Sequence, residues 1–344
     1  TRIAPIGGGL ALIDALVTYA EKFPEQIKFF YEMTAKDLII SSKGSIEGVR
    51  VITKSSECVE FIGKKIILAS GGFEGNPEML SRYLGPQSQY IRPVARGGYF
   101  NRGEGIRMAL EAGAAPAGDY GSFHAQPVDP RCGESEPVVL HYSFGILVNK
   151  NGVRFTDEGI NFIDASYEAT TREILEQPEG ISFAIFDSQI DDVPNWQKAV
   201  RTTVPPIKAD TISDLSTSIG LPNNELRQTL EDYNKACGLE AKFDPMSLDG
   251  MSTNGLTPRK SNWARKIEKG PFLAWPIIAA NCFTFGGLKI NARAQVLNMD
   301  GGIIPGLYAA GEVAGIYHRG YTGSTSVMRG AVTGRLAGLD SRGG

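Results

Sequence analysis

The chain has 344 residues, of which 42% are hydrophobic and 21% are charged, enough apolar material for one large or two medium globular domains. Its formal net charge is −3 and it holds no long run of like charges, so we expect no nucleic-acid partner. No segment approaches the roughly 18 consecutive apolar residues that span a bilayer, and the N-terminus lacks the basic-then-apolar order of a signal peptide.

The four cysteines lie far apart along the chain and form no CxxC pair. This spacing argues against a zinc site and against a dense disulfide framework. We therefore expect no metal, and we expect the protein to reside in the reducing cytoplasm.

The first elements form a helix and then a small sheet. Residues 10–22 place apolar side chains at helical spacing, which predicts a helix with one buried face. Alternating residues separated by Lys-Gly and Glu-Gly turn signals then predict short strands over 27–33, 36–41 and 48–53.

A strand covered on both faces is expected at 66–69, where the apolar run is continuous. Gly71 and Gly72 end it abruptly, which indicates close approach of the backbone to another group. Asn76 and Pro77 then begin a helix whose positive dipole end lies nearby.

Residues 117–275 have a different predicted pattern, in which short strands are followed by two helices. Short strands are expected over 145–150, 152–157 and 182–187. Ser213 caps a short predicted helix, and a second begins at 222–223. The buried face of the second helix is predicted to carry Leu226, Leu230 and Tyr233.

Residues 285–309 resume the pattern of the first segment, with short strands and glycine-containing turns. A buried strand is predicted at 306–310. The simplest account is one discontinuous domain, 1–116 and 276–344, with an inserted capping domain at 117–275. The expected fold class is α/β plus α+β.

The densest chemical signal lies in residues 307–338, where an apolar strand leads to Glu312, a glycine-rich loop and a small-residue helix. The Glu312 carboxylate can accept hydrogen bonds from sugar-like hydroxyls. The helix that begins near 323–325 offers free N–H groups to an electron-rich ring oxygen. Gly330, Gly334 and Gly338 allow close helix packing. These are the requirements of a flavin.

The AGEVAG and GYTG segments, followed by this helix, resemble the C-terminal flavin motif of the fumarate reductase-like flavoproteins. The ASGGFEGN and FGGLKIN segments resemble further signatures of that superfamily. The order of motifs along essentially the whole chain is most similar to tricarballylate dehydrogenases. The superfamily's N-terminal GxGxxG unit has no counterpart here, so the resemblance implies an incomplete Rossmann-like FAD-binding domain. We therefore expect a truncated chain that retains FAD weakly or not at all.

The resemblance implies FAD as cofactor and suggests where it lies. Glu312 would contact the ribityl chain, Gly71 and Gly72 would lie near the ADP side, and the remaining contacts would be Gly8 and Gly9 beside the flavin and Ser326 and Val327 at its pyrimidine edge.

His124 and His318 are the two histidines in suggestive positions, the first in GSFHAQP and the second in the glycine-rich loop. The resemblance to fumarate reductases implies that His124 binds a substrate carboxylate. Their proton-donating arginine aligns with Phe162, a second histidine is replaced near Phe283, and a late arginine aligns with Tyr321. Fumarate reduction by that family's mechanism is therefore not expected.

Tyr321 instead resembles the tyrosine that 3-ketosteroid dehydrogenases place near substrate and flavin. A phenol can donate a hydrogen bond to a carbonyl or move a proton, helped by a cation such as Arg319. Arg96, Arg102 and Arg319 are candidate carboxylate clamps, because a guanidinium matches a carboxylate at two points. Thr284 is a further candidate for substrate binding.

The predicted function is FAD-dependent oxidation or reduction of the CH–CH bond of a small polycarboxylate such as tricarballylate. Two alternatives stay open. The Tyr321 position favours a 3-oxosteroid or enone dehydrogenase, and the absent nucleotide fingerprint favours an inactive fragment. The expected partners are a small carboxylate substrate and an electron-acceptor protein.

Overall fold

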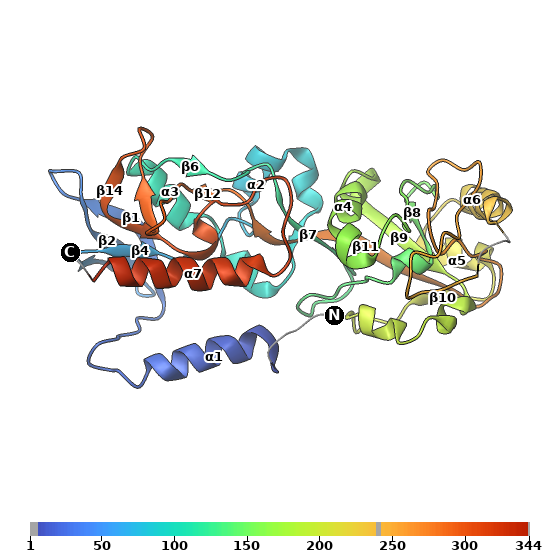
Figure 1. Ribbon diagram of the computed structural model, residues 1–344, viewed down its shortest axis with the longest axis horizontal. Helices are drawn as coiled ribbons and strands as arrows, with labels where there is room; N and C mark the ends of the chain where they lie inside the picture. Colours follow the sequence, from blue (N-terminus) through green and yellow to red (C-terminus); the bar gives the residue numbers. More distant parts are fainter. Residues whose placement is uncertain (1–5, 239–241, 343–344) are drawn as a thin grey trace.

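The computed structural model describes residues 6–238 and 242–342, which form two lobes along one long axis (Figure 1). In the first lobe lie β1–β4, β6, β12–β14, α1–α3 and α7, and in the second lie β8–β10 and α4–α6. Strand β11 extends from one lobe into the other.

Two three-stranded sheets form the frame of the first lobe. One is an antiparallel meander of β1 (Met33–Ile40), β2 (Ile46–Thr53) and β3 (Cys58–Ile62). The other has the order β13-β14-β4, with β13 (Gln295–Leu297), β14 (Ile303–Ala309) and β4 (Ile66–Leu68). The smaller elements are β6 (Pro116–Ala117), β12 (Gly287–Leu288), α1 (Gly8–Ala20), α2 (Pro77–Leu84), α3 (Glu104–Glu111) and α7 (Thr325–Asp340).

The core of the first lobe lies between the β13-β14-β4 sheet and helix α3. It includes Leu68, Phe73, Ile106, Leu307 and Val313, all buried. The predicted final strand is confirmed in β14. The helix predicted to begin at Asn76 and Pro77 is also confirmed, and the Asn76 side chain accepts hydrogen bonds from the first backbone N–H groups of α2.

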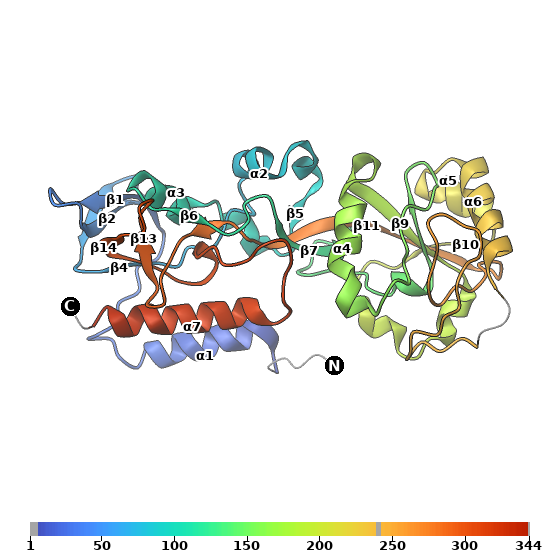
Figure 2. The same ribbon diagram turned by 45° about the horizontal axis from the view of Figure 1, so that its top comes forward.

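Helix α1 confirms the helix predicted over 10–22, but its buried face is absent. Leu10, Ile13 and Leu16 are 71%, 56% and 60% exposed, because none of the described chain packs against them. In Figure 1, α1 is separated from α7. In the turned view of Figure 2, α1 runs alongside α7.

Two strand predictions in the first lobe are also wrong. Residues 27–32 form no strand, since no described strand pairs with them and Phe30 is 56% exposed. Strand β4 is covered on one face only: Leu68 is buried, whereas Ile67 is 41% exposed. Ile67 is exposed because β4 is an edge strand of its sheet among the described strands.

The second lobe contains an antiparallel sheet buried on both faces. Its order is β10 (Ile207–Ala209), β11 (Phe272–Thr284), β9 (Ile181–Phe186) and β8 (Ile146–Asn149). Ile146 and Ile185 face a core shared with α5 (Ile212–Ile219) and α6 (Asn223–Ala236). Leu147 and Phe186 face a second core, where α4 (Ile163–Leu175) packs. This alternation follows the two-residue period of a strand.

The helix predictions for this lobe are mostly confirmed. Leu226, Leu230 and Tyr233 are buried on one face of α6, as their spacing predicts. The predicted cap Ser213 is wrong: Thr211 caps α5, and its hydroxyl accepts a hydrogen bond from the Asp214 backbone N–H at 3.1 Å. Residues 152–157 form only one isolated bridge instead of the predicted strand.

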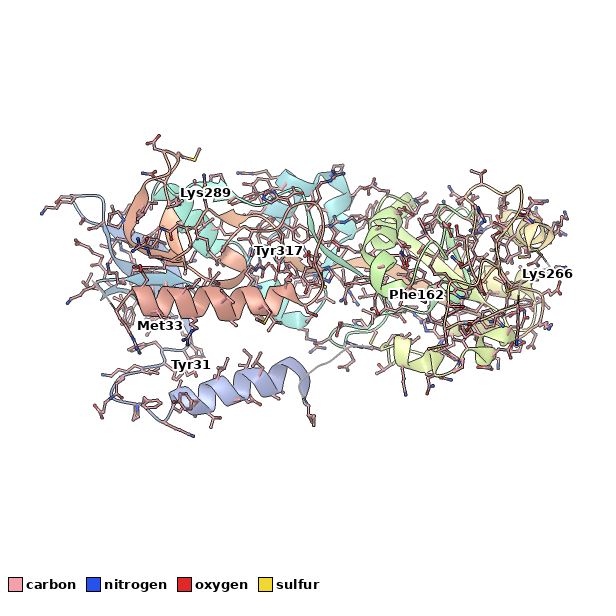
Figure 3. The ribbon with its side chains drawn as sticks, viewed as in Figure 1. Tyr31, Met33, Phe162, Lys266, Lys289 and Tyr317 are labelled. Atoms are coloured by element: carbon pink, nitrogen blue, oxygen red, sulfur yellow. The ribbon has the colours of Figure 1, made fainter. Side chains whose placement is uncertain are left out.

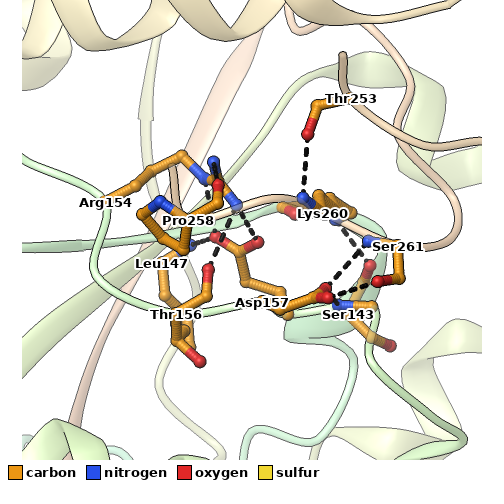
Figure 4. A network of polar contacts seen from close by, with 12 residues as sticks. Ser143, Leu147, Arg154, Thr156, Asp157, Thr253, Pro258, Lys260 and Ser261 are labelled. Atoms are coloured by element: carbon orange, nitrogen blue, oxygen red, sulfur yellow. Dashed lines mark hydrogen bonds and ion pairs between the residues drawn. The ribbon is translucent and has the colours of Figure 1, made fainter. Parts of the chain in front are cut away.

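A buried polar network replaces that strand (Figure 4). Arg154 pairs with Glu158 at 2.6 Å and donates to the Pro258 carbonyl oxygen at 2.9 Å. The fully buried Lys260 donates to the Ser143 carbonyl oxygen at 2.7 Å. Arg154 therefore joins the 154–158 segment to the segment that contains Pro258.

The 13-residue strand β11 links the two lobes. Its first half pairs with β9 and β10, and its second half pairs with β7 (Phe123–Val128) and β5 (Arg92–Pro93). The domain boundary expected between residues 275 and 276 falls inside this strand. The division into domains stays a prediction.

Candidate active site

Two predicted catalytic residues, His124 and Tyr321, meet at the junction of the lobes. His124 lies on β7 and is 4% exposed, and its ring centroid is 4.3 Å from that of Tyr321. Phe283 on β11 completes the group, at 5.3 Å from His124 and 5.2 Å from Tyr321. The register explains the contact, because Phe283 pairs with His124 across the β7–β11 ladder.

Hydrogen bonds connect these rings to other groups. The Tyr321 hydroxyl is 3.1 Å from the Ser326 hydroxyl, so a predicted catalytic residue touches a predicted cofactor ligand. The His124 Nε2 is 3.3 Å from the Tyr167 hydroxyl. Glu168 Oε2 lies 3.7 Å from His124 Nδ1 and accepts a hydrogen bond from the Tyr321 backbone N–H at 3.3 Å. The sequence did not indicate the role of Glu168.

Arg329 is a second residue that sequence reasoning missed. It is 5% exposed, and its guanidinium lies 5.2 Å from the Phe283 ring centroid and 4.7 Å from that of Tyr317. Burial lowers the pKa of Arg329, and the charge of Glu312 opposes that shift. Helix α7 is rich in small residues and carries two arginines, Arg329 and Arg335, of which only Arg329 is buried, so the sequence alone did not single it out. Arg329 places a cation next to the aromatic rings of Phe283 and Tyr317.

Glu312 lies within hydrogen-bond reach of Thr284. Its Oε1 accepts from the Thr284 backbone N–H at 2.8 Å and from the Thr284 hydroxyl at 3.2 Å. A Cβ at Gly72 would overlap with the same Oε1 and with the Thr284 hydroxyl oxygen. The expected close approach at Gly72 is therefore to Glu312 and Thr284.

Glu74, from the ASGGFEGN segment, is 3% exposed and lies next to the partly buried carboxyl group of Glu312. Burial first, and then the Glu312 charge, raises the pKa of Glu74 to about 9. Burial is also the main cause that raises the pKa of Glu312. At neutral pH Glu74 therefore holds a proton.

The N-terminus of α7 fits the expected flavin contact. Its N-cap residue, Ser324, has φ +66° and makes no side-chain cap, and the first turn carries no acidic residue. Ser326 is partly exposed and Val327 is 62% exposed. Uncapped N–H groups with a positive dipole end suit an electron-rich ring oxygen. The residues present therefore fit a flavin.

Other predicted cofactor and loop residues lie outside the His124–Tyr321 pair. Gly8 and Gly9 begin α1, where an added Cβ would meet nothing within 4 Å. Gly71 has φ +78° and packs against Asn101. His318 and Arg319 are exposed in the loop that leads to Tyr321.

Among the predicted substrate ligands, only Thr284 is buried, with its hydroxyl on Glu312. Arg102 lines a cavity of about 630 Å³ between α2 and α3, and Arg96 lies beside Gly133. No contact joins either arginine to His124 within 6–238 and 242–342. Phe162 is 45% exposed at the start of α4, in the second lobe, whereas Tyr317 lies near the junction (Figure 3).

Over the described residues, no group of three His, Cys, Asp or Glu side chains could hold a metal ion. No helix in the same residues is long and apolar enough to cross a membrane.

Known proteins are similar to this chain in sequence and in fold. The family model for the FAD binding domain matches residues 1–327. NADH:acrylate oxidoreductase of Vibrio harveyi is 31% identical, over 96% of this chain and 32% of its own length. The probable fumarate reductase Ifc3 of Shewanella frigidimarina is 27% identical, over 88% of this chain and 48% of its own. The chain thus spans about a third to a half of these relatives.

Two solved structures are similar to this chain in fold. The open conformation of a flavocytochrome c3 fumarate reductase matches with a TM-score of 0.74 and 25% identity, over 95% of this chain and 54% of that one. The 3-ketosteroid-Δ4-(5α)-dehydrogenase of Rhodococcus jostii RHA1 matches with a TM-score of 0.66 and 26% identity, over 99% of this chain and 65% of that one. The chain belongs to the FAD binding domain family, and its cofactor is FAD.

Proposed function

We propose that this chain handles the substrate of an FAD-dependent oxidoreductase, which transfers hydride to or from the carbon–carbon bond of a small carboxylate. FAD, when bound, supplies the hydride acceptor or donor. The observation that carries the proposal is the His124–Tyr321 pair, whose tyrosine touches Ser326 in the first turn of α7. Relatives named for acrylate, fumarate and urocanate support the substrate class.

Four groups of the chain would hold FAD. The uncapped N–H groups of Ser326 and Val327 would bind the pyrimidine edge, and Glu312 would accept from the ribityl hydroxyls. Gly71 and Gly72 would lie toward the ADP side, as Gly8 and Gly9 would toward the flavin.

The site residues would divide the remaining work. His124 would grip the substrate carboxylate, and the Tyr321 hydroxyl would hold or move a proton at the adjacent carbon. Phe283 and Tyr317 would exclude water from that carbon. Arg319 and His318 are exposed beside Tyr321 and would meet the outer part of the substrate.

A second candidate is a ketone or enone substrate. The Tyr167 hydroxyl and the Tyr321 ring lie beside His124, and tyrosine hydroxyls are donors that suit a carbonyl oxygen. The similarity to the ketosteroid dehydrogenase supports this candidate. Tricarballylate stays one proposed substrate, and it would require Arg96, Arg102 or Arg319 to reach the junction.

The proposal extends to partner and compartment. One relative is named for NADH and another, a fumarate reductase of Shewanella frigidimarina, is named for a cytochrome. An electron-donor or electron-acceptor protein is therefore part of the proposal. The four cysteines are all free, which suits a reducing cytoplasm.

The test is rapid-mixing measurement of flavin oxidation or reduction in the complete, FAD-loaded protein. The substrates are acrylate, fumarate, tricarballylate and a 3-oxosteroid. Tyr321→Phe should lower the hydride-transfer rate by roughly 10²–10⁴-fold with substrate affinity nearly kept, because a general acid or base contributes about that much.

The matched control is Tyr99→Phe, since Tyr99 is 52% exposed and lies outside the site. His124→Ala should mainly raise KM. A Tyr321→Phe protein that transfers hydride at the wild-type rate would contradict the role proposed for Tyr321.

A further inference from the structure

Glu168 connects three elements at the junction of the lobes. It lies on α4, and its side chain is 18% exposed. Its Oε1 accepts from Arg172 of the same helix at 2.9 Å. Its Oε2 lies 3.7 Å from His124 Nδ1 on β7 and accepts from the Tyr321 backbone N–H at 3.3 Å. One carboxylate therefore faces both residues of the candidate pair.

The position of Glu168 is itself held in place. Arg172 follows it by one helical turn, and the same guanidinium donates to the Phe123 carbonyl oxygen on β7. The Arg172 guanidinium also lies 5.2 Å from the Phe123 ring centroid. Arg172 thus holds helix α4 against β7 beside His124, and it bonds Oε1 of Glu168, whereas Oε2 accepts from Tyr321.

The contacts of His124 leave one ring nitrogen for Glu168. Nε2 meets the Tyr167 hydroxyl at 3.3 Å, while Nδ1 is buried and makes no other hydrogen bond within the described residues. A carboxylate opposite Nδ1 favours the tautomer with the proton there, which leaves Nε2 as the acceptor. A shift of about 0.7 Å would bring Nδ1 and Oε2 to ordinary hydrogen-bond distance.

We propose that Glu168 is a positioning residue: its carboxylate orients the His124 ring and tethers the Tyr321 backbone, and so joins helix α4 of the second lobe to the glycine-rich loop of the first. This inference rests on the proposed function, because it assigns a purpose to the His124–Tyr321 pair. Its structural part, the tether between α4 and the loop, has a readout that needs no turnover.

The charged and titratable groups around the carboxylate are His124, Arg172, Tyr321, Tyr167 and Cys282. Burial raises the pKa of Glu168, but the nearby His124 and the hydrogen-bonded Arg172 outweigh it and lower that pKa, so Glu168 is a carboxylate at neutral pH. A carboxylate accepts from both of its oxygens, whereas an amide accepts from one and donates from the other. This difference makes glutamine an informative substitution.

The test compares Glu168→Gln, Glu168→Asp and the control Glu173→Gln in the complete, FAD-loaded protein. In Glu168→Gln, Arg172 retains the amide oxygen and the amide NH₂ faces the Tyr321 N–H, donor against donor. Glu168→Asp keeps the carboxylate but withdraws it by about 1.5 Å, one carbon–carbon bond. Glu173 is exposed on the same helix and loses the same charge.

Two measurements follow. Amide hydrogen exchange of the peptide that contains Tyr321 should be at least about tenfold faster in Glu168→Gln, with a smaller increase in Glu168→Asp and none in Glu173→Gln. The kcat of Glu168→Gln should fall about tenfold or more with little change in KM, and Glu168→Asp should recover part of it. The peptide that contains Leu226, in the core of the second lobe, should exchange equally in all variants.

The outcomes separate this inference from the proposed function. Unchanged exchange at Tyr321 in both Glu168 variants would overturn the tether, whatever the activity. Faster exchange at Tyr321 without turnover of any substrate by the wild type would support the tether and contradict the proposed function. Equal loss of kcat in Glu168→Asp and Glu168→Gln, with a lowered melting temperature in both, would show a merely structural role and overturn the inference.

Discussion

Glu74 and Glu312 make the first lobe sensitive to pH. The pKa of Glu74 is raised to about 9 from 4.5, so folding takes up a proton between these values. The stabilisation by this proton is complete below about pH 4.5 and is lost as pH rises toward 9. The loss amounts to roughly 1.4 kcal/mol per pH unit at most.

Glu74→Gln should therefore remove part of this pH dependence, because glutamine keeps a hydrogen-bond donor toward Glu312 at every pH. Urea unfolding at pH 5, 7 and 9 should show the variant gaining stability relative to wild type as pH rises. An equal difference between the two proteins at all three pH values would contradict the raised pKa.

Glu312 supports the fold as well as the proposed cofactor site. Glu312→Ala would leave the fully buried Thr284 backbone N–H without its acceptor at 2.8 Å. A buried unsatisfied donor costs about 1–3 kcal/mol, so the variant should lose stability as well as flavin.

The comparison for this prediction is Glu312→Gln, which keeps an acceptor oxygen and should retain most of the stability. Calorimetry and the flavin-to-protein absorbance ratio measure the two effects separately. Loss of flavin with unchanged stability in Glu312→Ala would show that Glu312 serves the cofactor alone.

At the scale of elements, the apolar periodicity of the sequence predicted where helices form better than it predicted whether their apolar faces are buried. The same apolar spacing occurs in α1 and α6, but Leu226 is fully buried in α6 while Leu16 is 60% exposed in α1. Leu226→Ala should cost about 2–5 kcal/mol of unfolding free energy. Leu16→Ala should change it by less than about 0.5 kcal/mol. Urea unfolding of the two matched variants checks this, and a comparable loss in both would show that α1 is packed in solution.

Much of the candidate site was accessible from sequence because its residues belong to motifs. His124, Tyr321, Ser326 and Glu312 lie in segments that resemble known flavoproteins, and the structure brings the first three into one connected group. Their contact depends on the β7–β11 register, which spacing along the chain does not encode.

The residues that were missed owe their roles to partners distant in sequence. Glu168 and Arg329 look like ordinary helix charges until α4 and α7 are placed beside His124 and Tyr317. Glu74 lies inside a recognised motif, but its protonation depends on Glu312. The cap of α5 was misplaced by two residues because Ser213 and Thr211 are both good capping residues.

At the scale of the whole molecule, the first lobe exposes a sheet edge and apolar side chains. β4 lies at the edge of its sheet, Ile67 is 41% exposed, and Val327, Met328 and Val332 are exposed on α7. Open edges and apolar patches promote association. The 344-residue chain alone should therefore self-associate at micromolar concentrations in sedimentation velocity.

Ile67→Lys should reduce that association, because a charge on the edge strand opposes pairing with another chain. Met299→Lys is the control, since Met299 is 73% exposed on a turn away from β4. Equal association of both variants would place the contact elsewhere.

Strand β11 also has a consequence for how the chain unfolds. Its 13 residues pair with β9 of the second lobe at one end and with β7 at the other, and its last residue, Thr284, bonds Glu312 of the first lobe, so neither lobe can lose this strand without weakening the other. Independent melting of the lobes would require one strand to be ordered at one end and released at the other. The two lobes should therefore behave as a single cooperative unit, in which destabilisation at the flavin site is transmitted to the hydrophobic cores of the second lobe.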